Sequence, residues 1–357
     1  MKRRNFLKKT IGIGSIAAAS TLSAPAISKG RIKWKMVTTW PKNFPGLGTG
    51  AQRIADSITE MSEGQLTIKL FAAGELVPAF ESFDAVRQQT AQMSHGSSYY
   101  WINKNKSFPF FAGVPGGLTA QEHNAWIHHG GGQELWDELY ANFDVKGFLG
   151  GNTGVQMGGW FNKKINSLED FKGLKMRIPG LGAEVINRMG ATAVSLPGGE
   201  IMPALQSGAI DATEWVGPWN DLAFGFYKVA NHYYGPGFHE PGSHTECIVS
   251  KPAFDELPKN LKKIVEHACV SENGKMLAEF TYANNIAQQK LIGFGVNIKS
   301  FPDDVYNEMF KISDEVVAET ANEGEINKRI YNSWFKFKKE IMERAPFAEK
   351  GYMNRRG

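Results

Sequence analysis

The segment DATEWVGPWND, which begins at Asp211, brings the carboxylates of Asp211, Glu214 and Asp221 close to Trp215 and Trp219. A Gly-Pro pair in its middle is incompatible with a helix interior. Carboxylate oxygens are ligands for hard cations, and large aromatic rings commonly line ligand sites. The alternative interpretation is a solvated acidic loop whose tryptophans belong to the core.

The string SLEDFKGLKMRIPG, which begins at Ser167, reads as a short capped helix, a glycine turn and a strand that ends at Arg177. An arginine at a strand end in a cleft between domains can hold a carboxylate through two parallel N–H···O bonds, a geometry that lysine cannot copy. A surface arginine that pairs with Asp170 or Glu169 fits the same pattern. These residues alone leave both roles of Arg177 open.

The string GLGTGA, which begins at Gly46, matches the glycine pattern of dinucleotide-binding loops. In that motif the glycines directly follow a strand. Here the expected strand ends near Thr39, and a loop with Pro41 and Pro45 intervenes. We therefore expect a flexible loop that caps the N-terminus of a helix, and no bound nucleotide.

Two histidine patterns resemble metal sites at first sight. His239, Glu240 and His244 have the spacing H-E-x-x-x-H, but the Pro-Gly pair between them prevents the helix that aligns two imidazoles in zinc proteases. His128 and His129 precede three glycines and have no matching cysteine or carboxylate nearby. We expect ordinary polar positions in both places. The sequence also contains no G-x-S-x-G elbow and no recognisable catalytic Cys/His pair.

The elements that must position these residues follow an α/β pattern. We expect strands at residues 32–39, 66–71, 92–97, 174–178, 192–196, 209–213, 246–250 and 295–300. Helices are expected at residues 49–61, 79–89, 181–189, 199–206 and 258–291, and from residue 302 onward. This order predicts two α/β lobes joined by a hinge, with a ligand cleft between them and a long helical C-terminal region.

The domain organisation that we expect has four parts. Residues 1–26 form a signal peptide, residues 27–150 a first lobe that later segments complete, residues 151–250 a second lobe, and residues 251–357 the return segments and long helices.

The signal peptide is predicted from a basic start, a short apolar stretch and the cleavage pattern Ala24-Pro25-Ala26. The pair Arg3-Arg4 followed by Asn-Phe-Leu-Lys resembles the twin-arginine export signal, although Lys2 stands where Ser or Thr is usual. General secretion and a retained membrane anchor are the alternatives, but the apolar run is short against the roughly 20 residues that span a membrane. We expect a soluble, exported protein.

Export also removes the apparent basic excess of the chain. The 40 Lys and Arg residues face 36 Asp and Glu residues, and the signal peptide takes away five basic residues and no acidic one, which leaves 35 against 36. A nucleic-acid-binding function therefore loses its only support. Cys247 and Cys269 are expected in a strand and a helix. Two buried thiols are the default interpretation, and a disulfide is the alternative.

Four strings together carry a resemblance to a known family: GVQMGGWF, MRIPG, DATEWVGPWND and GFHEPG. The chain resembles the substrate-binding subunits of tripartite ATP-independent periplasmic (TRAP) transporters, in the DctP-like branch that binds 2-oxo acids and related 2-hydroxy acids. The resemblance covers essentially the whole mature chain. It implies a two-lobe periplasmic receptor that binds a small monocarboxylate such as pyruvate or lactate and delivers it to a membrane permease, without catalysis.

The resemblance also implies site residues. Arg177 holds the carboxylate of the ligand, and further ligand contacts are implied for Asn220 and for Tyr99 or Tyr100 of the first lobe. A cation that also touches the ligand is implied to lie among Gln156, Glu214, the main-chain carbonyl of Trp215, and Glu240.

Electrostatics supports such a cation. Glu214 and Glu240 in one desolvated cleft repel each other and an incoming carboxylate, so with Arg177 alone opposing them the site carries about −2. A bound cation removes this imbalance. Because the implied ligands are all oxygen atoms, we expect Na⁺ or Ca²⁺ rather than zinc or copper.

Two other function classes remain as alternatives. The first is a twin-arginine-exported oxidoreductase or metal-assisted enzyme that acts on keto acids. The sequence offers no plausible base, haem motif or dinucleotide loop for it. The second is an interaction module at the membrane surface, which would bind no small molecule.

The C-terminal helical region predicts a homodimer. It has apolar residues on two sides, of which one can pack on its own lobe and the other needs a partner. The first side carries Ile326, Ile330, Trp334, Phe337 and Ile341, and the second carries Tyr331 and Phe335.

Overall fold

Two β-sheets form the frame of the protein in the computed structural model, which describes residues 30–356. The first sheet contains, in spatial order, β2 (Leu66–Phe71), β1 (Ile32–Thr38), β3 (Met93–Gly96), β10 (His244–Ser250) and β4 (Val145–Asn152). The second contains β11 (Asn297–Lys299), β9 (His232–Tyr234), β5 (Gly159–Phe161), β8 (Ala212–Thr213), β6 (Lys175–Arg177) and β7 (Thr192–Val194). The predicted signal peptide, residues 1–26, lies outside the described residues.

Both sheets are mixed. In the first, β1 runs parallel to β2 and β3, whereas β10 is antiparallel to β3 and β4. In the second, β6 is parallel to β7 and β8, and β5 is antiparallel to β8 and β9. Residues 31–356, which include both sheets, lie in one compact unit.

The strand β10 comes late in the chain but pairs within the first sheet. It falls in the range that the sequence assigns to the second lobe, residues 151–250. All seven of its residues are buried, and such a strand needs a neighbour on each edge to satisfy its backbone groups. The chain therefore leaves the first sheet after β4, builds most of the second sheet, and returns through the segment before β10.

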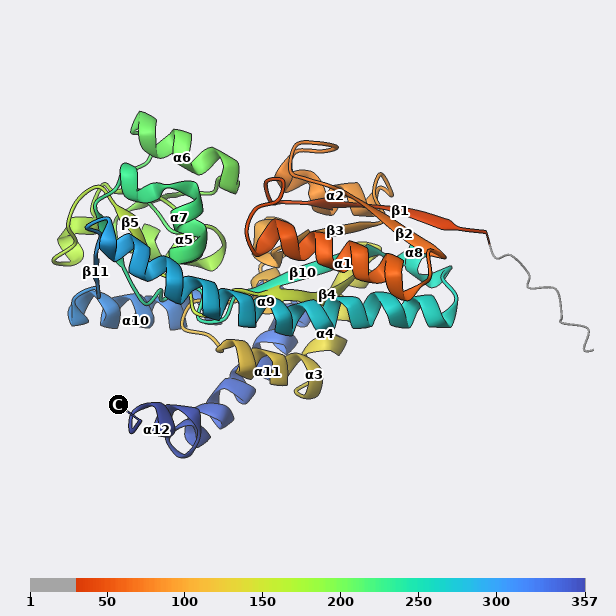
Figure 1. Cartoon of the computed structure of the whole chain (residues 1–357). Helices are drawn as coiled ribbons and strands as arrows, with labels where there is room; N and C mark the ends of the chain where they lie inside the picture. Colours follow the sequence, from red (N-terminus) through yellow and green to blue (C-terminus); the bar gives the residue numbers. More distant parts are fainter. Residues whose placement is uncertain (1–29, 357) are drawn as a thin grey trace, which may run out of the picture. The chain divides into compact units, whose positions relative to one another are not determined.

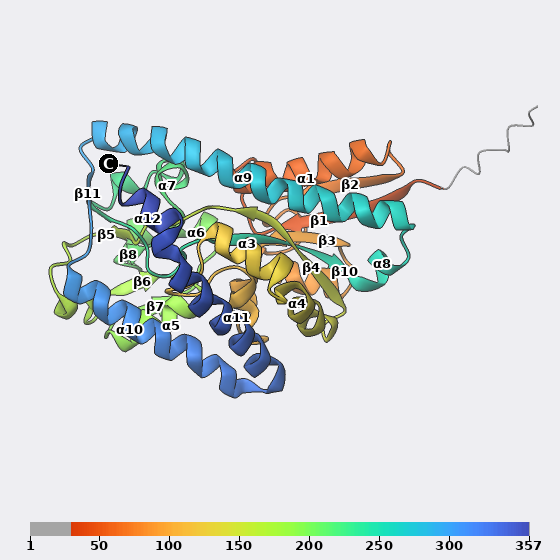
Figure 2. The same cartoon turned by 90° about the horizontal axis from the view of Figure 1, so that it is seen from below.

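Helices cover both sheets (Figure 1). α1 (Leu47–Met61) and α2 (Ser82–Arg87) pack on the first sheet, and α5 (Gly180–Arg188) and α6 (Gly198–Ser207) pack on strands of the second. The 35-residue helix α9 (Lys259–Gly293) extends along both lobes, as Figures 1 and 2 both show. It contacts α1 and β4 of the first lobe and α7 (Pro218–Phe224) of the second.

The C-terminal helices also reach both lobes. α10 (Asp303–Glu319) packs against α5, and α11 (Glu325–Arg344) packs against α3 (Ala120–His129) and α4 (Gly132–Ala141), as Figure 2 shows from below. The short helix α8 (Lys251–Asp255) precedes α9, and the short helix α12 (Glu349–Met353) follows α11. Along residues 30–356, no helix combines the length and the apolar character that a membrane span requires.

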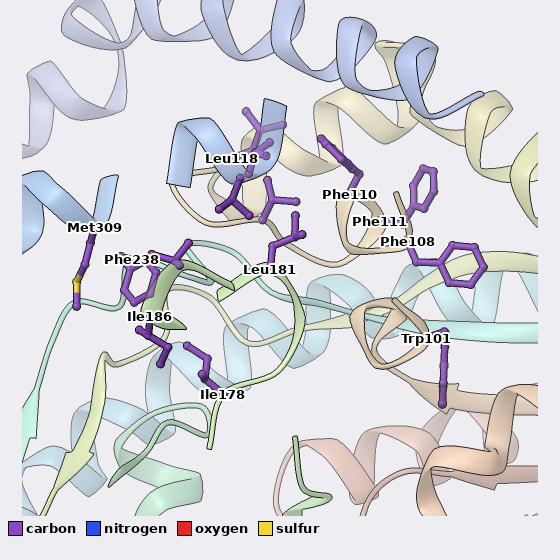
Figure 3. Close-up of a cluster of buried hydrophobic side chains, with 14 of the residues drawn as sticks. Trp101, Phe108, Phe110, Phe111, Leu118, Ile178, Leu181, Ile186, Phe238 and Met309 are labelled. Atoms are coloured by element: carbon purple, nitrogen blue, oxygen red, sulfur yellow. The ribbon is translucent and has the colours of Figure 1, made fainter. Parts of the chain in front are cut away.

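The hydrophobic core is shared between the lobes. Figure 3 shows Trp101 and Phe108 of the first lobe together with Ile178, Leu181 and Phe238 of the second, all in one buried cluster. A second cluster likewise joins residues of the first sheet to residues of the second. The lobes therefore pack directly on each other around the site described below. Cys247 and Cys269 are both buried free thiols.

The expected strands and helices are present, with ends that differ by a few residues. The prediction did not cover β5, β9, α3, α4 and α7. It also did not cover β4, whose sequence VKGFLGGN is unusually rich in glycine for a strand. Close packing explains those glycines, because a Cβ on Gly147 would lie 2.4 Å from the ring of Trp136, and one on Gly151 would lie 2.4 Å from the sulfur of Met276.

The first glycine of the GLGTGA string allows neighbouring helices to pack closely. Gly46 precedes α1 with φ +70, and a Cβ there would lie 2.6 Å from the ring of Phe280 and 2.9 Å from the ring of Trp219. The glycine thus lets α1, α7 and α9 meet closely. This agrees with a helix N-terminus and gives no support to a nucleotide loop.

Candidate functional site

Arg177 ends β6, as the sequence predicts, and is 1% exposed. Its Nε donates to the carbonyl of Leu196 at 3.0 Å, and its Nη1 donates to the carbonyl of Glu214 at 3.2 Å and also pairs with the Glu214 carboxylate. The buried Nη2 has no partner within residues 30–356. Arg177 is therefore a fixed, buried cation with donors still free for a ligand.

The alternative role for Arg177, a surface ion pair, is wrong. The carboxylate of Asp170 caps its own turn by accepting the N–H groups of Asn166 and Ser167. The other acidic neighbour, Glu169, pairs with Lys172 on the surface.

The segment DATEWVGPWND is largely buried. Glu214 and Asp221 are each 1% exposed, so a solvated acidic face is wrong for these two carboxylates. Glu214 follows β8, and α7 begins only at Pro218, which leaves irregular backbone between them. In this part of the described chain the Trp215 carbonyl accepts no hydrogen bond from another residue. A buried carbonyl without a donor is an unusual and costly group unless a ligand or ion binds it.

The Trp215 ring forms a wall of the site. The Arg177 guanidinium lies 5.1 Å from its centroid, and Trp40 of the first lobe contacts it edge to face at 6.1 Å. The Trp215 Nε1 is buried without a partner in residues 30–356. This tryptophan therefore connects the arginine to the first lobe.

Gln156 and Glu240 lie on the two segments that cross between the lobes, one between β4 and β5 and the other between β9 and β10. The Gln156 backbone N–H donates to the carbonyl of Glu240 at 3.1 Å, and its Nε2 donates to the Glu240 carboxylate at 2.7 Å. The Gln156 Oε1 is buried and has no partner among the described residues. These bonds hold the two crossing segments together and leave the Gln156 Oε1 without a partner in residues 30–356.

His239 also belongs to this cluster, so the expectation of an ordinary polar position is wrong for this residue. Its Nε2 lies 3.1 Å from Oε2 of Glu214, and one ligand atom from each of Glu214, His239 and Glu240 lies within 4.8 Å of the other two. Its ring packs closely on Gly237, where an added Cβ would lie 2.9 Å from Cε1 of His239. No local pattern could have revealed this residue, because β8 and β9 must pair with β5 before Glu214 and His239 can meet.

The electrostatics of the cluster reflect burial and mutual repulsion. Burial, followed by the charge of Glu214, raises the pKa of Glu240 to about 7, although His239 and Arg177 oppose the shift. Burial alone would lower the pKa of His239, but its bond to Glu214 and the charges of Glu214 and Glu240 outweigh burial and raise it. A cation between the carboxylates would therefore stabilise their charged forms.

The first lobe closes the site with aromatic rings. Tyr99 and Tyr100 lie on a 3-10 turn, Ser98–Trp101, and their rings are 4.8 Å apart. Burial raises the pKa of Tyr100 to about 12, with Arg177 opposing the shift and Glu240 and Glu214 adding to it. Both tyrosines border the same cavity as Gln156 and Trp215.

A small cavity of about 10 Å³ lies between Tyr99 and Tyr100 of the first lobe and Gln156 and Trp215. It is bordered by Trp40, Leu47, Ser97, Tyr99, Tyr100, Thr153, Gln156, Trp215, Val216, Ser243 and Thr245. A larger hollow of about 420 Å³ shares Tyr99 and Tyr100 with it. Room for about one water molecule means that side chains or lobes must move to admit an organic acid.

Four site candidates, Arg177, Glu214, Glu240 and Asn220, do not border this cavity. The last of them, Asn220, lies in α7. Its Nδ2 donates to the carbonyl of Pro45 at 3.0 Å, which links α7 to the segment before α1. The Oδ1 is buried without a partner in the described part of the chain.

Comparisons with known proteins identify relatives along almost the whole chain. The sequence model of the DctP family, bacterial extracellular solute-binding protein family 7, matches residues 36–323. A monocarboxylate 2-oxoacid-binding periplasmic protein of Nostoc sp. (strain PCC 7120) is 41% identical over 360 residues, 99% of this chain and 98% of the relative.

Two solved structures are also similar. A TRAP periplasmic solute-binding protein from Pseudoalteromonas atlantica T6c, with bound sodium and pyruvate, has a TM-score of 0.89 and 38% identity, covering 92% of this chain and 100% of that one. A TRAP transporter solute-binding protein from Bordetella bronchiseptica RB50, a dimer with calcium and picolinate in one active site, has a TM-score of 0.89 and 37% identity, covering 91% and 96%.

These likenesses extend along almost the whole chain and confirm the two-lobe periplasmic binding-protein fold. The protein belongs to the DctP family of bacterial extracellular solute-binding proteins, the periplasmic solute receptors of TRAP transporters.

Proposed function

We propose that this protein binds a small 2-oxo or 2-hydroxy monocarboxylate of the pyruvate or lactate type together with Na⁺ or Ca²⁺, and delivers the acid to its membrane permease. The observation that carries the proposal is the buried Arg177, with its free Nη2, beside two buried glutamates and two unpaired oxygen acceptors. The Nostoc relative and the sodium–pyruvate structure support this choice of ligands.

Arg177 is the anchor for the ligand carboxylate. Its Nε and Nη1 are held by Leu196 and Glu214, which fixes the plane of the guanidinium, while Nη2 remains available. Charge-assisted bonds from a fixed guanidinium are among the strongest polar contacts in proteins. The neighbouring Tyr100 supplies a neutral hydroxyl on the side of the first lobe.

The residues that would hold the cation are Gln156, Glu214, Trp215 and Glu240. The Gln156 Oε1 and the Trp215 carbonyl lack protein partners among the described residues, and the two carboxylates are buried close together. This is a set of oxygen donors, which suits Na⁺ or Ca²⁺. When bound, the ion would add to the positive charge of Arg177, which lies beside two glutamates and the proposed organic acid.

The finding that family members are solute receptors supports a role without catalysis. The oxidoreductase alternative has no supporting observation in the site. Incubation of the protein with pyruvate or lactate and a dye acceptor should give stoichiometric binding and no steady turnover, and sustained dye reduction would contradict this part of the proposal.

Titration of pyruvate and lactate into protein stripped of divalent ions tests the main proposal. The protein is dialysed into potassium buffer, and the titration is repeated with added Na⁺ and with added Ca²⁺. We expect one of the two ions to raise the affinity for the acid, and the acid to raise the affinity for the ion by the same factor. Equal affinity in all three buffers, with no metal retained by elemental analysis, would overturn the cation site.

We also propose a homodimer through the C-terminal helices. The first side of α11 is used internally, since Ile330 and Trp334 are buried, whereas Phe335 is 47% and Met342 58% exposed. The exposed surface continues into Phe347, which is 91% exposed. The Bordetella protein is a dimer, which supports this proposal. A monomeric mass by light scattering at tens of micromolar would contradict it.

Export by the twin-arginine route is the last part of the proposal. It is supported by the Arg3-Arg4 pair and the residues that follow. Arg3→Lys combined with Arg4→Lys should abolish periplasmic accumulation, whereas unchanged accumulation would indicate general secretion.

A further inference from the structure

Asp221 is a buried carboxylate that the proposed site does not use directly. It is 1% exposed and lies in the first turn of α7. Its Oδ2 accepts the Trp160 Nε1–H at 2.9 Å and the Tyr233 hydroxyl at 2.7 Å, and its Oδ1 accepts the Val216 backbone N–H at 3.4 Å. The side chain is therefore bonded to the second sheet on one side and to the irregular backbone after Glu214 on the other.

The bonds of Asp221 require two acceptor oxygens. All three partners donate, and the indole and the backbone amide can do nothing else. An asparagine at position 221 would place its oxygen toward Trp160 and Tyr233, because both of these side chains donate. Its NH₂ group would then point toward the Val216 N–H. The Val216 bond would be replaced by a contact between two donors.

This bond matters because of where Val216 lies. It directly follows Trp215, whose carbonyl lacks a hydrogen-bond donor within residues 30–356. The Val216 carbonyl accepts the Met157 backbone N–H at 2.9 Å, so the peptide groups on both sides of Val216 are held. Met157 in turn follows Gln156. The direction of the Trp215 carbonyl is thus set by a backbone that Asp221 and Met157 fix together.

We propose that Asp221 is a positioning residue for the cation site: through Val216 it orients the Trp215 carbonyl toward the oxygens of Gln156, Glu214 and Glu240. This inference rests on the proposed function, which places a cation there. Trp160 and Tyr233 provide the rigid support, since their rings stack at 4.0 Å with an interplanar angle of 14° and both are fully buried.

The first lobe contains a matched control for this arrangement. Glu246 is also fully buried and also accepts one indole N–H and one tyrosine hydroxyl, from Trp101 at 2.7 Å and from Tyr140 at 2.6 Å. It makes no hydrogen bond to residues 214–217. Glu246→Gln therefore removes a comparable buried carboxylate without touching the backbone at Trp215.

The experiment measures ion affinity and acid affinity separately in Asp221→Asn, Glu246→Gln and wild-type protein. Ion affinity is obtained by titrating Na⁺ or Ca²⁺ at fixed pyruvate, and acid affinity by titrating pyruvate at saturating ion. For Asp221→Asn we expect ion affinity to fall by about tenfold, the effect of one lost bond and a misdirected ligand. Acid affinity at saturating ion should stay near that of the wild type. Glu246→Gln should lower the melting temperature and leave ion affinity unchanged.

Asp221→Glu is the second variant, for the case that Asp221→Asn does not fold. It keeps the charge but lengthens the side chain by one methylene, so it cannot reach the Val216 N–H and the Trp160–Tyr233 pair with the same backbone. It should also weaken ion binding. Wild-type ion affinity in either folded Asp221 variant, with only a lower melting temperature, would show a structural role and overturn the inference while the proposed function stands. Acid binding by the wild type that is independent of ions would overturn both.

Discussion

The two lobes contribute different chemistry to the site. The second lobe supplies an ion pair, with Arg177 at the end of β6 and Glu214 just after β8. The first lobe supplies neutral rings and hydroxyls, among them Trp40, Tyr99 and Tyr100. The crossing segments between the lobes add Gln156 and Glu240.

This difference indicates that the two lobes have different roles in binding. Charged groups on one lobe can recognise the acid with strong, directional bonds, while the other lobe excludes water and adds weaker contacts. Because Gln156 and Glu240 lie where the chain passes between lobes, an ion bound to them would also join the two halves. We therefore expect substitutions to have larger effects in the crossing segments and the second lobe than in the first lobe.

The largest effect should come from Glu240→Gln. It replaces a proposed ion ligand by a neutral amide, and changes in residues that merely orient metal ligands already cost about 10- to 100-fold in affinity. We expect ion affinity to fall by about 100-fold or more, and acid affinity in ion-containing buffer to fall with it. Calorimetric titration of each ligand measures both values.

Glu246→Gln is the control for Glu240→Gln, because it removes another fully buried glutamate from the same part of the chain. It should leave both affinities unchanged. If Glu240→Gln lowers stability but leaves acid affinity intact, Glu240 has a structural role and the crossing segments do not hold an ion.

Arg177→Lys should have the next largest effect. Lysine keeps the charge but cannot bond to Leu196 and Glu214 and still present a fixed donor to a ligand. We expect acid binding to weaken by about 1.5 to 3 kcal/mol, the range for bonds to charged groups. Near-wild-type pyruvate affinity in calorimetry would remove Arg177 as the carboxylate anchor and with it the charged role of the second lobe.

Sequence periodicity was enough to predict the α/β class, most of the strands and the position of Arg177, because each depends on residues close together in the chain. It could not decide whether Arg177 is buried, since this depends on Leu196 and Glu214, which pairing within the second sheet brings beside it. The contact between His239 and Glu214 could not be predicted for the same reason. The spacing of His239 to His244 excludes a zinc helix but says nothing about Glu214, which lies 25 residues away.

The contacts of Asp221 could not be predicted from the sequence either. Asp221 lies in an acidic, tryptophan-rich string, but its partners Trp160 and Tyr233 lie on β5 and β9, and local patterns carry no information about them. Glycine-rich β4 was missed because its glycines serve contacts with α4 and α9. In each case the feature that was not predicted depends on a contact between elements that are distant in the sequence.

The buried carboxylates predict how stability depends on pH. Burial raises the pKa of Glu246 to about 7, with its bonds to Tyr140 and Trp101 opposing the shift. The folded protein then holds this proton more tightly than the unfolded chain does. The resulting stabilisation is complete below the unfolded pKa and is lost as pH rises through the folded pKa.

We therefore expect the free energy of unfolding of the wild type, measured without acid or added ion, to fall relative to that of Glu246→Gln by about 1 to 3 kcal/mol between about pH 5 and pH 8. Urea unfolding at several pH values measures this difference. Parallel curves for the two proteins would mean that Glu246 stays ionised throughout. Asp221 and Glu240, whose pKa values burial also raises to about 7, should keep part of the slope in the variant.

The smallest effect should come from Tyr100→Phe in the first lobe. The ring, which packs at 4.8 Å from Phe80 and 6.2 Å from Trp40, is retained, and only a neutral hydroxyl near Arg177 is lost. A neutral hydrogen bond contributes about 0.5 to 1.5 kcal/mol, so acid affinity should fall by roughly this amount while ion affinity stays unchanged. Pyruvate titration at saturating ion, carried out beside Arg177→Lys, gives the ratio of the two effects. A loss in Tyr100→Phe equal to that in Arg177→Lys would show that the first lobe recognises the acid as strongly as the second, and the division between a charged lobe and an aromatic lobe would then be wrong.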